Sequence, residues 1–540
     1  MKMLLQILIF LVCQGVFLEL RSTCGMTVKK EIVQQRINPY TQHLHSLLRE
    51  PPLRATENSL QKDLVQELWL EQKLDHFDAT NNRTWLMRYL RNDRYQQPPH
   101  GPIYIFVGGE WEISPAYLLT GHLHDIARQH GGVLYYVEHR FYGQSWPAVD
   151  AAVENLRYLS ARQALADLAH FIRQLKANEV GLAHTKVILA GASYSGSLVA
   201  WFAKLYPDLI SAGWASSAPL VAKMDFREYM QQVGEVVEHR GGRQCSGRLE
   251  SGLISMATQL ESSNASQLLQ ALRVCNNFEP TNPLDRAALF NGIGNYFAAY
   301  AQLYDDQIAS ICAPLITPTD YDDSTAFIQF VRRIFWPEAE SVKYAEDWCI
   351  DLSYEGMKSI FTDTTELLSG TRQWFYQSCH EFGWFITTTS GRQNARPKDI
   401  RQMPTTRRHA QWSPLQYSFG RQVSLNYFQQ LCRVVFDPHS DTAAHSGSVG
   451  DISISVQQTN SQFGGLTAAI ALQQRVIFTH GQLDPWRGVG LQEGKNVITI
   501  PDCSHTADLD SINFNDSVEM NVAKLKVAAF LRSVLRRAAN

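Results

Sequence analysis

Short apolar runs alternate with longer amphipathic stretches in the first half of the chain. The runs Pro102–Val107, Val133–Val137 and Val187–Ala190 are four to six residues long and nearly all apolar, which is typical of buried parallel strands. Between the second and third runs, apolar residues within 161–175 follow the i, i+3, i+4 spacing of a helix, and Ser160 opens this helix as part of a capping box. The pattern predicts strand, helix, strand.

The same alternation of short apolar runs and amphipathic stretches returns near the end of the chain. Arg475–Phe478 and Val497–Ile500 are predicted strands, and Ser517–Leu535 is a predicted amphipathic helix. The intervening residues combine helical stretches, cysteines and irregular polar loops such as Arg392–Gln411. One α/β sheet interrupted by a large insertion explains both halves. We therefore divide the chain into a core at 67–222 and 460–540 and a helical insertion at 223–459.

The N-terminus has the layout of a signal peptide over residues 1–22, with an apolar run from Met3 to Leu18 behind the positive charge of Lys2. An uncleaved membrane anchor is the alternative, but Gln6 and Gln14 interrupt the run. Residues 23–66 are polar and mixed, as in a lead-in or a pro-segment. We expect entry into the secretory pathway, with an extracellular or lysosomal destination and no membrane anchor after signal removal.

Composition narrows the class of protein. The 540 residues are 45% hydrophobic and 19% charged, which allows a large core. Lys plus Arg number 49 against 52 Asp plus Glu, giving a net charge of −3 without long runs of either sign. Nucleic acid is therefore not an expected partner.

Secretory entry changes how the nine cysteines are interpreted. Once Cys13 leaves with the signal, an even number remains for disulfides, and five of these lie between Cys245 and Cys379. No C-x-x-C spacing occurs, so no metal site is predicted. Three N-x-[ST] triplets are candidate glycosylation sites, at Asn82, Asn264 and Asn515.

A serine flanked by small residues follows the third predicted strand. Ser193 lies in Gly191-Ala192-Ser193-Tyr194-Ser195-Gly196 between that strand and a helical pattern, which is the context of a nucleophile elbow. The strict motif requires Gly at position 195, where this chain has Ser, with Gly196 next. The alternative is a tight turn without a catalytic role. We predict that Ser193 is the nucleophile.

A serine nucleophile needs a histidine base and a carboxylate that orients it. Asp484 follows the strand that starts at Arg475, and His505 follows the strand Val497–Ile500, so both lie at strand ends in the order Ser, Asp, His. His480 and Asp508 are the nearest rivals. Ser193, Asp484 and His505 form the predicted triad, and no cofactor is required.

Backbone donors for the developing oxyanion are expected at two places. One is the N–H of Tyr194, directly after the nucleophile. The other is the N–H of Gly109, in the Gly108-Gly109-Glu110-Trp111 loop after the first predicted strand. An ordinary Gly-Gly turn is the alternative for this loop.

These stretches resemble a family of serine peptidases that includes lysosomal Pro-Xaa carboxypeptidase, dipeptidyl peptidase II and thymus-specific serine protease. The matching segments occur in order from residue 72 to residue 505: residues 72–77, 108–110, 138–145, 191–196, 216–219, 376–383, 481–486 and 504–505. The resemblance implies an α/β-hydrolase fold in which the insertion is a mainly helical, disulfide-bonded cap. It also implies cleavage of peptides near a terminus, after proline or another small residue.

The resemblance leaves the attacked end of the peptide open, because the loop has Glu110 and Trp111 where peptidase members usually have Gly-Asn-Glu-Gly. This loop is more similar to the thymus-specific branch. Glu110 could pair with a substrate α-amino group or brace the loop, and Trp111 lies beside it. Tyr376 and Glu381, in the segment 376–383, could line the substrate pocket or belong to the core of the cap.

The leading hypothesis is a secreted or lysosomal serine exopeptidase with peptide substrates as its partners. The sequence is compatible with either a monomer or a homodimer. An esterase or lipase would use the same triad on the same fold. A catalytically silent binding protein on a hydrolase scaffold is the third hypothesis, against which the complete triad argues.

Overall fold

The computed structural model describes nine stretches of the chain. They are residues 36–37, 47–53, 64–97, 101–179, 181–335, 349–365, 369–388, 419–437 and 452–536. Arg392–Gln411, most of the predicted signal peptide and lead-in, and Cys24 lie outside these stretches.

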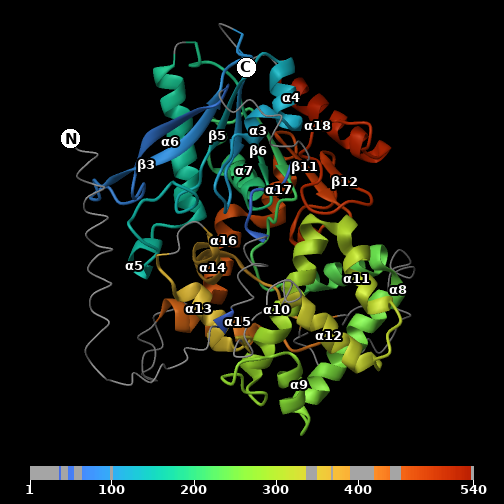
Figure 1. Ribbon diagram of the computed structural model, residues 1–540. Coiled ribbons are helices and arrows are strands. Elements are labelled where there is room, and N and C mark those ends of the chain that lie inside the picture. The colour runs from blue at the N-terminus through green and yellow to red at the C-terminus, as the bar shows by residue number, and fades with distance from the viewer. Residues whose placement is uncertain are drawn as a thin grey trace, which may run out of the picture.

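An eight-stranded sheet with the order β12-β11-β7-β6-β4-β5-β3-β2 forms the centre of the upper half of the molecule (Figure 1). β3 pairs antiparallel with β2 and β5, and all other neighbours in this sheet pair parallel. The strands are β2 (Gln66–Lys73), β3 (Thr84–Asn92), β4 (Ile103–Val107), β5 (Val133–Val137), β6 (Val187–Ala192), β7 (Ala212–Ser216), β11 (Val476–Gly481) and β12 (Val497–Ile500). This mostly parallel sheet with helices on both faces confirms the predicted α/β-hydrolase fold.

All five predicted strands are present, as β4, β5, β6, β11 and β12, with ends displaced by a few residues. The prediction missed the antiparallel edge formed by β2 and β3, where apolar residues are interspersed with charged ones. It also missed β7, whose sequence Ala-Gly-Trp-Ala-Ser contains small residues in place of β-branched ones. β7 is nevertheless fully buried between β6 and β11, so its position in the sheet overrides its weak strand propensity.

Alternate residues of the strands face two different cores. Ile103 and Ile105 of β4 belong to the core that includes α6 (Ala161–Asn178) and α7 (Tyr194–Leu205). Tyr104 and Phe106 belong to the core that includes α4 (His122–Gln129) and α18 (Val518–Arg536). The central strands are therefore buried on both faces, which explains why they are apolar throughout rather than alternating.

The capping box predicted at Ser160 is half formed. The Ser160 hydroxyl accepts a hydrogen bond from the backbone N–H of Gln163 at 3.2 Å. The Gln163 side chain does not return the bond; it donates to Asp75 at 2.6 Å and accepts from the N–H of His76 at 3.0 Å. Gln163, the third residue of α6, therefore holds the turn after β2. This tertiary contact replaces the bond that the Gln163 side chain would make to the backbone of Ser160 in a complete capping box.

Between β7 and β11 the described chain is mainly helical and lies below the sheet in Figure 1. Its larger helices are α8 (Arg227–Leu260), α9 (Ala265–Ala271), α10 (Pro283–Leu303), α11 (Ile308–Ile316), α12 (Asp323–Phe335), α13 (Tyr354–Thr362), α14 (Thr371–Gln377), α15 (Leu425–Phe436), α16 (Ile452–Phe463) and α17 (Gly465–Leu472). Short elements join them: β8 (Lys223–Asp225), η3 (Asp305–Gln307), β9 (Cys349–Ile350), η4 (Ser378–Phe382) and β10 (Gly383–Phe385). We call residues 223–459 of this part the insertion; these boundaries stay predictions, and α16 crosses the second one while α17 follows it.

Three disulfides stabilise the insertion. They join Cys245 to Cys312, Cys275 to Cys349, and Cys379 to Cys432. The predicted disulfide bonding of the insertion is confirmed. Cys503 forms no disulfide with another described residue, and burial raises the pKa of its thiol well above the usual range.

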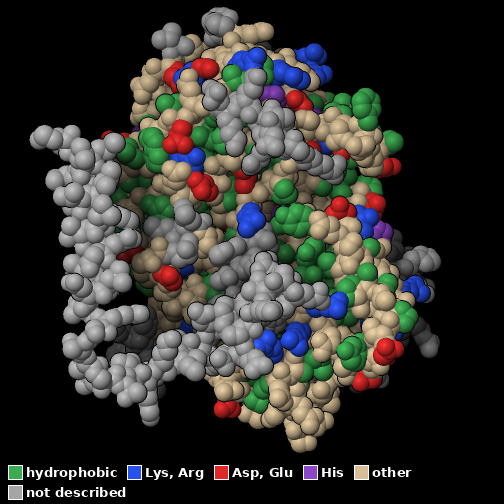
Figure 2. Space-filling model, in the orientation of Figure 1, with side chains coloured by type: hydrophobic (Ala, Val, Ile, Leu, Met, Phe, Trp, Pro, Cys, Tyr) green, Lys and Arg blue, Asp and Glu red, His purple; other side chains and the backbone are tan. Residues whose placement is uncertain are grey.

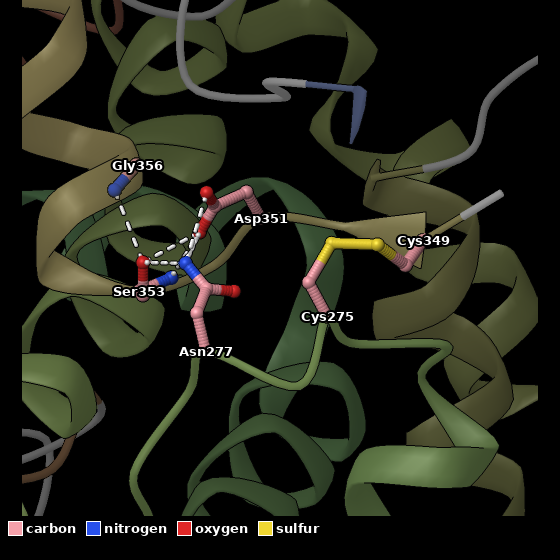
Figure 3. The surroundings of a disulfide bond; sticks show 6 residues. All are labelled: Cys275, Asn277, Cys349, Asp351, Ser353 and Gly356. Atoms are coloured by element: carbon pink, nitrogen blue, oxygen red, sulfur yellow. Dashed lines mark hydrogen bonds between the residues drawn. A yellow bond between two sulfur atoms is a disulfide. The ribbon is translucent and has the colours of Figure 1, made fainter. Parts of the chain in front are cut away.

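The second disulfide fixes the beginning of α13 through a polar cluster (Figure 3). The Asn277 side chain, two residues after Cys275, donates to both carboxylate oxygens of Asp351 at 3.1 Å. Ser353 caps α13 by accepting from the N–H of Gly356 at 3.0 Å. The cystine and the hydrogen bonds therefore join two turns of the insertion that are far apart in sequence. β9 also pairs with β1 (Arg36–Ile37), which connects the start of the chain to the same place.

The surface of the described chain agrees with the low net charge, because acidic and basic side chains are interspersed on the face in Figure 2. Asn82, Asn264 and Asn515 are all exposed, as a glycan acceptor must be, but glycosylation itself stays a prediction. Within the described stretches, no helix combines the length and hydropathy needed to cross a bilayer.

A fully buried ion pair joins three segments of the core. The Arg140 guanidinium donates to both oxygens of Asp167, at 2.6 and 2.7 Å, and to the carbonyls of Leu74 and Tyr158 at 3.0 and 2.9 Å. His76 contacts the same carboxylate at 2.7 Å. Burial raises the pKa of Asp167, but the Arg140 charge and these hydrogen bonds hold it below its usual value. The loop after β2, the loop after β5 and α6 are thus locked together.

We expect Arg140→Met to lower the free energy of unfolding by about 3–5 kcal/mol, because it leaves the Asp167 charge buried without its partner. Urea denaturation followed by circular dichroism measures the loss. Arg128→Met is the matched control, since the Arg128 side chain is 54% exposed and lies 3.7 Å from Asp125. A control effect above about 0.5 kcal/mol, or equal losses for both variants, would contradict the assignment.

Candidate active site

Ser193 occupies a strained turn between β6 and α7. Its φ and ψ are 55° and −130°, a conformation that non-glycine residues rarely adopt and that often marks a functional site. A Cβ on Gly191 would lie 2.4 Å from the Ser195 carbonyl oxygen, and one on Gly196 would lie 2.9 Å from the Ser216 carbonyl oxygen. Both glycines are therefore sterically required, which is the reason the elbow is recognisable from sequence.

The departure from the strict elbow motif has a structural explanation. The Ser195 hydroxyl folds back onto the turn and lies 2.8 Å from the N–H and 2.9 Å from the carbonyl oxygen of Ala192. Ser195 is fully buried and satisfied there, so the turn accepts its side chain. At the neighbouring position 196, by contrast, a Cβ would clash with the Ser216 carbonyl oxygen, so glycine is required there and not at position 195.

Asp484 and His505, the predicted acid and base, are in contact in the structure. His505 Nδ1 lies 2.8 Å from Asp484 Oδ1, which also accepts the N–H of Trp486 at 2.9 Å. Both side chains are buried. Burial raises the pKa of Asp484, but the positive field and hydrogen bonding of the neighbouring histidines outweigh burial and hold the pKa well below its usual value. Asp484 therefore stays ionised and can fix the His505 tautomer with its proton on Nδ1.

Parallel strand ends bring this pair beside the elbow. The N–H of Ser193 donates to the Ser216 carbonyl at 2.9 Å, at the end of β7. The next residue, Ser217, accepts the N–H of Thr506 at 2.9 Å through its hydroxyl. The end of β7, which neighbours the strand before Ser193, is thus hydrogen-bonded to Thr506, the residue that follows His505. His505 Nε2 is buried and has no hydrogen-bond partner among the described residues, which leaves it free for a serine hydroxyl or a substrate.

His480 and Asp508, the alternatives considered for the base and the acid, make other contacts. His480 Nδ1 lies 3.9 Å from Asp484 Oδ2, whereas His505 contacts the other carboxylate oxygen, Oδ1. Asp508 accepts the Ser216 hydroxyl at 2.6 Å, a contact that fixes the end of β7. The close Nδ1 contact with the carboxylate therefore favours His505 over His480 as the base.

The two predicted oxyanion donors lie at the ends of neighbouring strands. Tyr194 is the first residue of α7, where backbone N–H groups have no intrahelical partner. Gly109 follows β4, and a Cβ there would lie 2.6 Å from the Trp111 ring, so a larger residue would require that ring to move. The N–H of Gly108 is already bonded to the Val137 carbonyl at 2.8 Å. Gly109 and Tyr194 remain the proposed donors.

A cavity of about 910 Å³, including its open mouth, connects the elbow to the insertion. Ser193 and Glu110 line it at the core side. Aromatic and aliphatic side chains form most of the wall, namely Trp374, Phe375, Trp384, Phe385, Trp486, Tyr229, Phe361, Met357, Ile386, Tyr427, Phe428 and Leu431.

The N-terminal stretch contributes to this wall. Leu47 and Leu48 line the cavity, and the Ser114 N–H donates to the Glu50 carboxylate at 3.1 Å. The Tyr117 hydroxyl donates to the Pro51 carbonyl at 2.8 Å. Part of the stretch predicted as a lead-in or pro-segment is therefore bonded to the core beside the site.

The other three predicted substrate-binding residues have different surroundings. Trp111 donates from Nε1 to the Tyr136 hydroxyl at 2.8 Å, and the Tyr376 ring stacks on His380 at 4.0 Å. Glu381 accepts the N–H of Ala161 at 3.0 Å, at the start of α6. None of the three lines the cavity, so we do not carry their predicted role further.

Glu381 instead belongs to a buried network behind the nucleophile. The Gln377 amide donates to Glu381 and to the Tyr194 hydroxyl, at 3.0 and 3.1 Å. His139 Nε2 lies 3.1 Å from the same hydroxyl. Burial raises the pKa of Glu381 to about 7. The network ties the 376–383 segment of the insertion to the side chain of the residue that follows Ser193.

Gln302 was not found from the sequence. Its side-chain oxygen accepts the Tyr229 hydroxyl at 2.7 Å and Trp486 Nε1 at 2.9 Å, and its carbonyl accepts the His505 N–H at 3.3 Å. This α10 residue therefore holds both the turn after Asp484 and the histidine loop. A lone glutamine in a helix carries no signal for such a role.

Comparison with family models matches residues 72–527 to serine carboxypeptidase S28. The chain belongs to this family. It is therefore a serine-type peptidase, which confirms the resemblance seen in the motifs. Thymus-specific serine protease of Mus musculus is 28% identical over 494 residues, covering 87% of each chain. Lysosomal Pro-X carboxypeptidase of Homo sapiens is 23% identical over 492 residues, covering 87% of this chain and 88% of the relative.

Solved structures with similar parts include an open-form lipase, 11% identical with a TM-score of 0.30, covering 87% of this chain and all of the lipase. An arylesterase is 15% identical with a TM-score of 0.22, and the match covers 34% of this chain and 52% of the arylesterase chain. The fold assignment rests on the strand order and not on these low scores.

We expect Gln302→Leu to lower kcat/KM of this peptidase by about 100-fold, because it removes the acceptor of the Tyr229 hydroxyl and of Trp486 Nε1, and a small displacement of the turn after Asp484 misaligns the site. Assays with a short peptide substrate measure the loss, and Gln302→Glu, which keeps the acceptor, should recover part of it. Gln307→Leu is the control, since Gln307 is exposed at the end of η3. Unchanged kinetics in Gln302→Leu, with its fold intact by circular dichroism, would remove Gln302 from the positioning residues.

Proposed function

We propose that the protein hydrolyses short peptides near a terminus through an acyl-enzyme formed on Ser193. The observation that supports this most directly is the 2.8 Å contact between His505 Nδ1 and Asp484 Oδ1 beside a serine elbow. His505 Nε2 would take the Ser193 hydroxyl proton as Oγ bonds to the carbonyl carbon of the peptide, and would then return it to the leaving amine. Water, activated by the same nitrogen, releases the acyl group.

The oxyanion formed in each step would be stabilised by the N–H groups of Gly109 and Tyr194. Asp484 remains ionised and stabilises the imidazolium without accepting its proton. Because these groups are preorganised in a buried site, little reorganisation is needed during the reaction.

The cavity supports the exopeptidase form of the proposal. Its walls come from both the insertion and the core, which supports restricted access of folded proteins to Ser193. The indole rings of Trp374, Trp384 and Trp486 suit a flat apolar ring, in keeping with cleavage after proline or another small residue. The three disulfides support a place in the secretory pathway, extracellular or lysosomal.

We expect Ser193→Ala and His505→Ala each to lower kcat by about 10⁶-fold, since the two residues act as one unit. Asp484→Asn should cost about 10⁴-fold through loss of the productive His505 tautomer. A fluorophosphonate probe should label the wild type at Ser193 and leave Ser193→Ala unlabelled. His480→Gln should keep most of the activity; loss in this variant, with normal turnover in His505→Ala, would move the base to His480.

The labelling experiment also separates the alternatives. An absence of labelling together with intact binding of peptides would favour a catalytically silent binding protein. Labelling with turnover of esters and none of peptides would favour an esterase or lipase.

We expect short unstructured peptides to be shortened by one or two residues and the same sequences inside a folded protein to be resistant, because only a free chain end fits the cavity. Mass spectrometry of the digests measures the products. A long peptide blocked at both ends serves as the control. Efficient internal cleavage of this control would contradict the exopeptidase form while leaving the serine mechanism intact.

A further inference from the structure

Residues 47–53, which we call the N-terminal segment, are bonded to the part of the chain that follows β4. The Glu50 carboxyl group accepts the N–H of Ser114 at 3.1 Å and also the Ser114 hydroxyl. The Tyr117 hydroxyl donates to the Pro51 carbonyl at 2.8 Å. Segments near a chain terminus are usually poorly ordered unless such contacts tie them down. The N-terminal segment is therefore a built part of the fold.

The same carboxyl group is connected to the loop that carries a proposed oxyanion donor. Glu50 hydrogen-bonds to the Tyr136 side chain, whose hydroxyl also accepts Trp111 Nε1 at 2.8 Å. The Trp111 ring lies against Gly109, where a Cβ would come within 2.6 Å of it. Two aromatic side chains thus link the N-terminal segment to the neighbourhood of the reacting carbonyl.

Two leucines of the N-terminal segment face the substrate cavity. Leu47 and Leu48 line it together with Ser193, and Leu48 is only 9% exposed. Before them along the chain, β1 pairs with β9 of the insertion, and after them Glu50 is bonded to the core. Along the chain the leucines therefore lie between a contact with the insertion and a contact with the core, the two parts that form the other cavity walls.

The chemistry of these two leucines identifies the group that they would contact. Apolar surface that lines a cavity gains free energy when an apolar group covers it. Catalysis at Ser193 would bring a peptide into this cavity, so an apolar side chain of that peptide is the group available to cover Leu47 and Leu48. One methylene more or less in an apolar pocket changes kcat/KM by about 10–200-fold. The two leucines can therefore influence which peptides are cleaved without touching the reacting atoms.

We propose that the N-terminal segment is part of the substrate site of the mature enzyme, in which Leu47 and Leu48 bind an apolar side chain of the peptide and determine substrate preference. This inference rests on the proposed peptidase function and deepens it by assigning a ligand to this part of the wall. It also limits processing. Removal of the whole stretch 23–66, predicted as a lead-in or pro-segment, would take this wall away, so any cut in the active enzyme falls before Leu47.

Pairs of short peptides that differ only by leucine or alanine, with each position varied in turn, test the proposal. Leu47→Ala and Leu48→Ala should each lower kcat/KM for the leucine peptide by about 10-fold at one position, mainly through a higher KM, because they remove a contact made equally before and during the reaction. The matching alanine peptide should change by less than about 3-fold. A merely structural role would lower kcat/KM for both peptides by the same factor, and that result would overturn the proposal.

Arg49→Ala is the matched control, since Arg49 is exposed between Leu48 and Glu50, and it should keep the wild-type preference. Fluorophosphonate labelling of Ser193 should persist in both leucine variants, which separates a change in substrate preference from loss of folding or of the nucleophile. If labelling of Leu48→Ala fails, Leu48→Val supplies the comparison. A wild type that neither labels nor cleaves would instead overturn the serine peptidase function.

Amino-terminal sequencing of the active enzyme, purified from the cells that make it, tests the limit on processing. Every active molecule should retain residues 47–53, whether or not residues closer to the N-terminus are removed. Active enzyme that lacks residues 47–53 and still prefers the leucine peptide would overturn the proposal.

Discussion

The parallel hydrogen-bond ladder from β6 through β7 and β11 to β12 is the constraint on which the rest of the site depends. Parallel strands end at the same edge of a sheet, so loops from distant parts of the chain meet there. Ser193 lies after β6, whereas Asp484 and His505 lie 291 and 312 residues later in the sequence. The ladder converts this separation into a 2.8 Å contact between acid and base beside a strained serine.

The insertion contributes more than a cover over this edge. Gln302 holds the histidine loop and the turn after Asp484 from α10. Gln377 holds the Tyr194 hydroxyl from α14. Because both residues are buried, a movement of the insertion would displace the histidine loop and the residue after Ser193. The Cys379–Cys432 disulfide joins η4, which directly follows α14, to α15.

Charge is distributed unevenly around the reaction centre. Asp484 is surrounded by histidines and stays ionised, whereas Glu110 lies in an apolar cavity and holds a proton more tightly than usual. Asp484 contacts His505 at 2.8 Å, whereas Glu110 Oε2 has no hydrogen-bond partner among the described residues. The two carboxyl groups thus differ in protonation because their surroundings differ.

The sequence by itself determined the elements whose signals are local. Apolar runs located β4, β5, β6, β11 and β12, and the steric demand for Gly191 and Gly196 revealed the elbow. The order of Ser193, Asp484 and His505 at strand ends then predicted the triad, which the geometry of the acid and base supports.

Only the tertiary structure decided what surrounds these residues. It placed β7 in the sheet despite its weak strand propensity, and it made Glu110 the one carboxyl group among the described residues that line the cavity. Trp111, Tyr376 and Glu381 are not among those residues. Periodicity reports whether a residue is buried, but not which distant side chain it meets. A cavity built from segments hundreds of residues apart is therefore defined by packing and cannot be predicted from the order of residues along the chain.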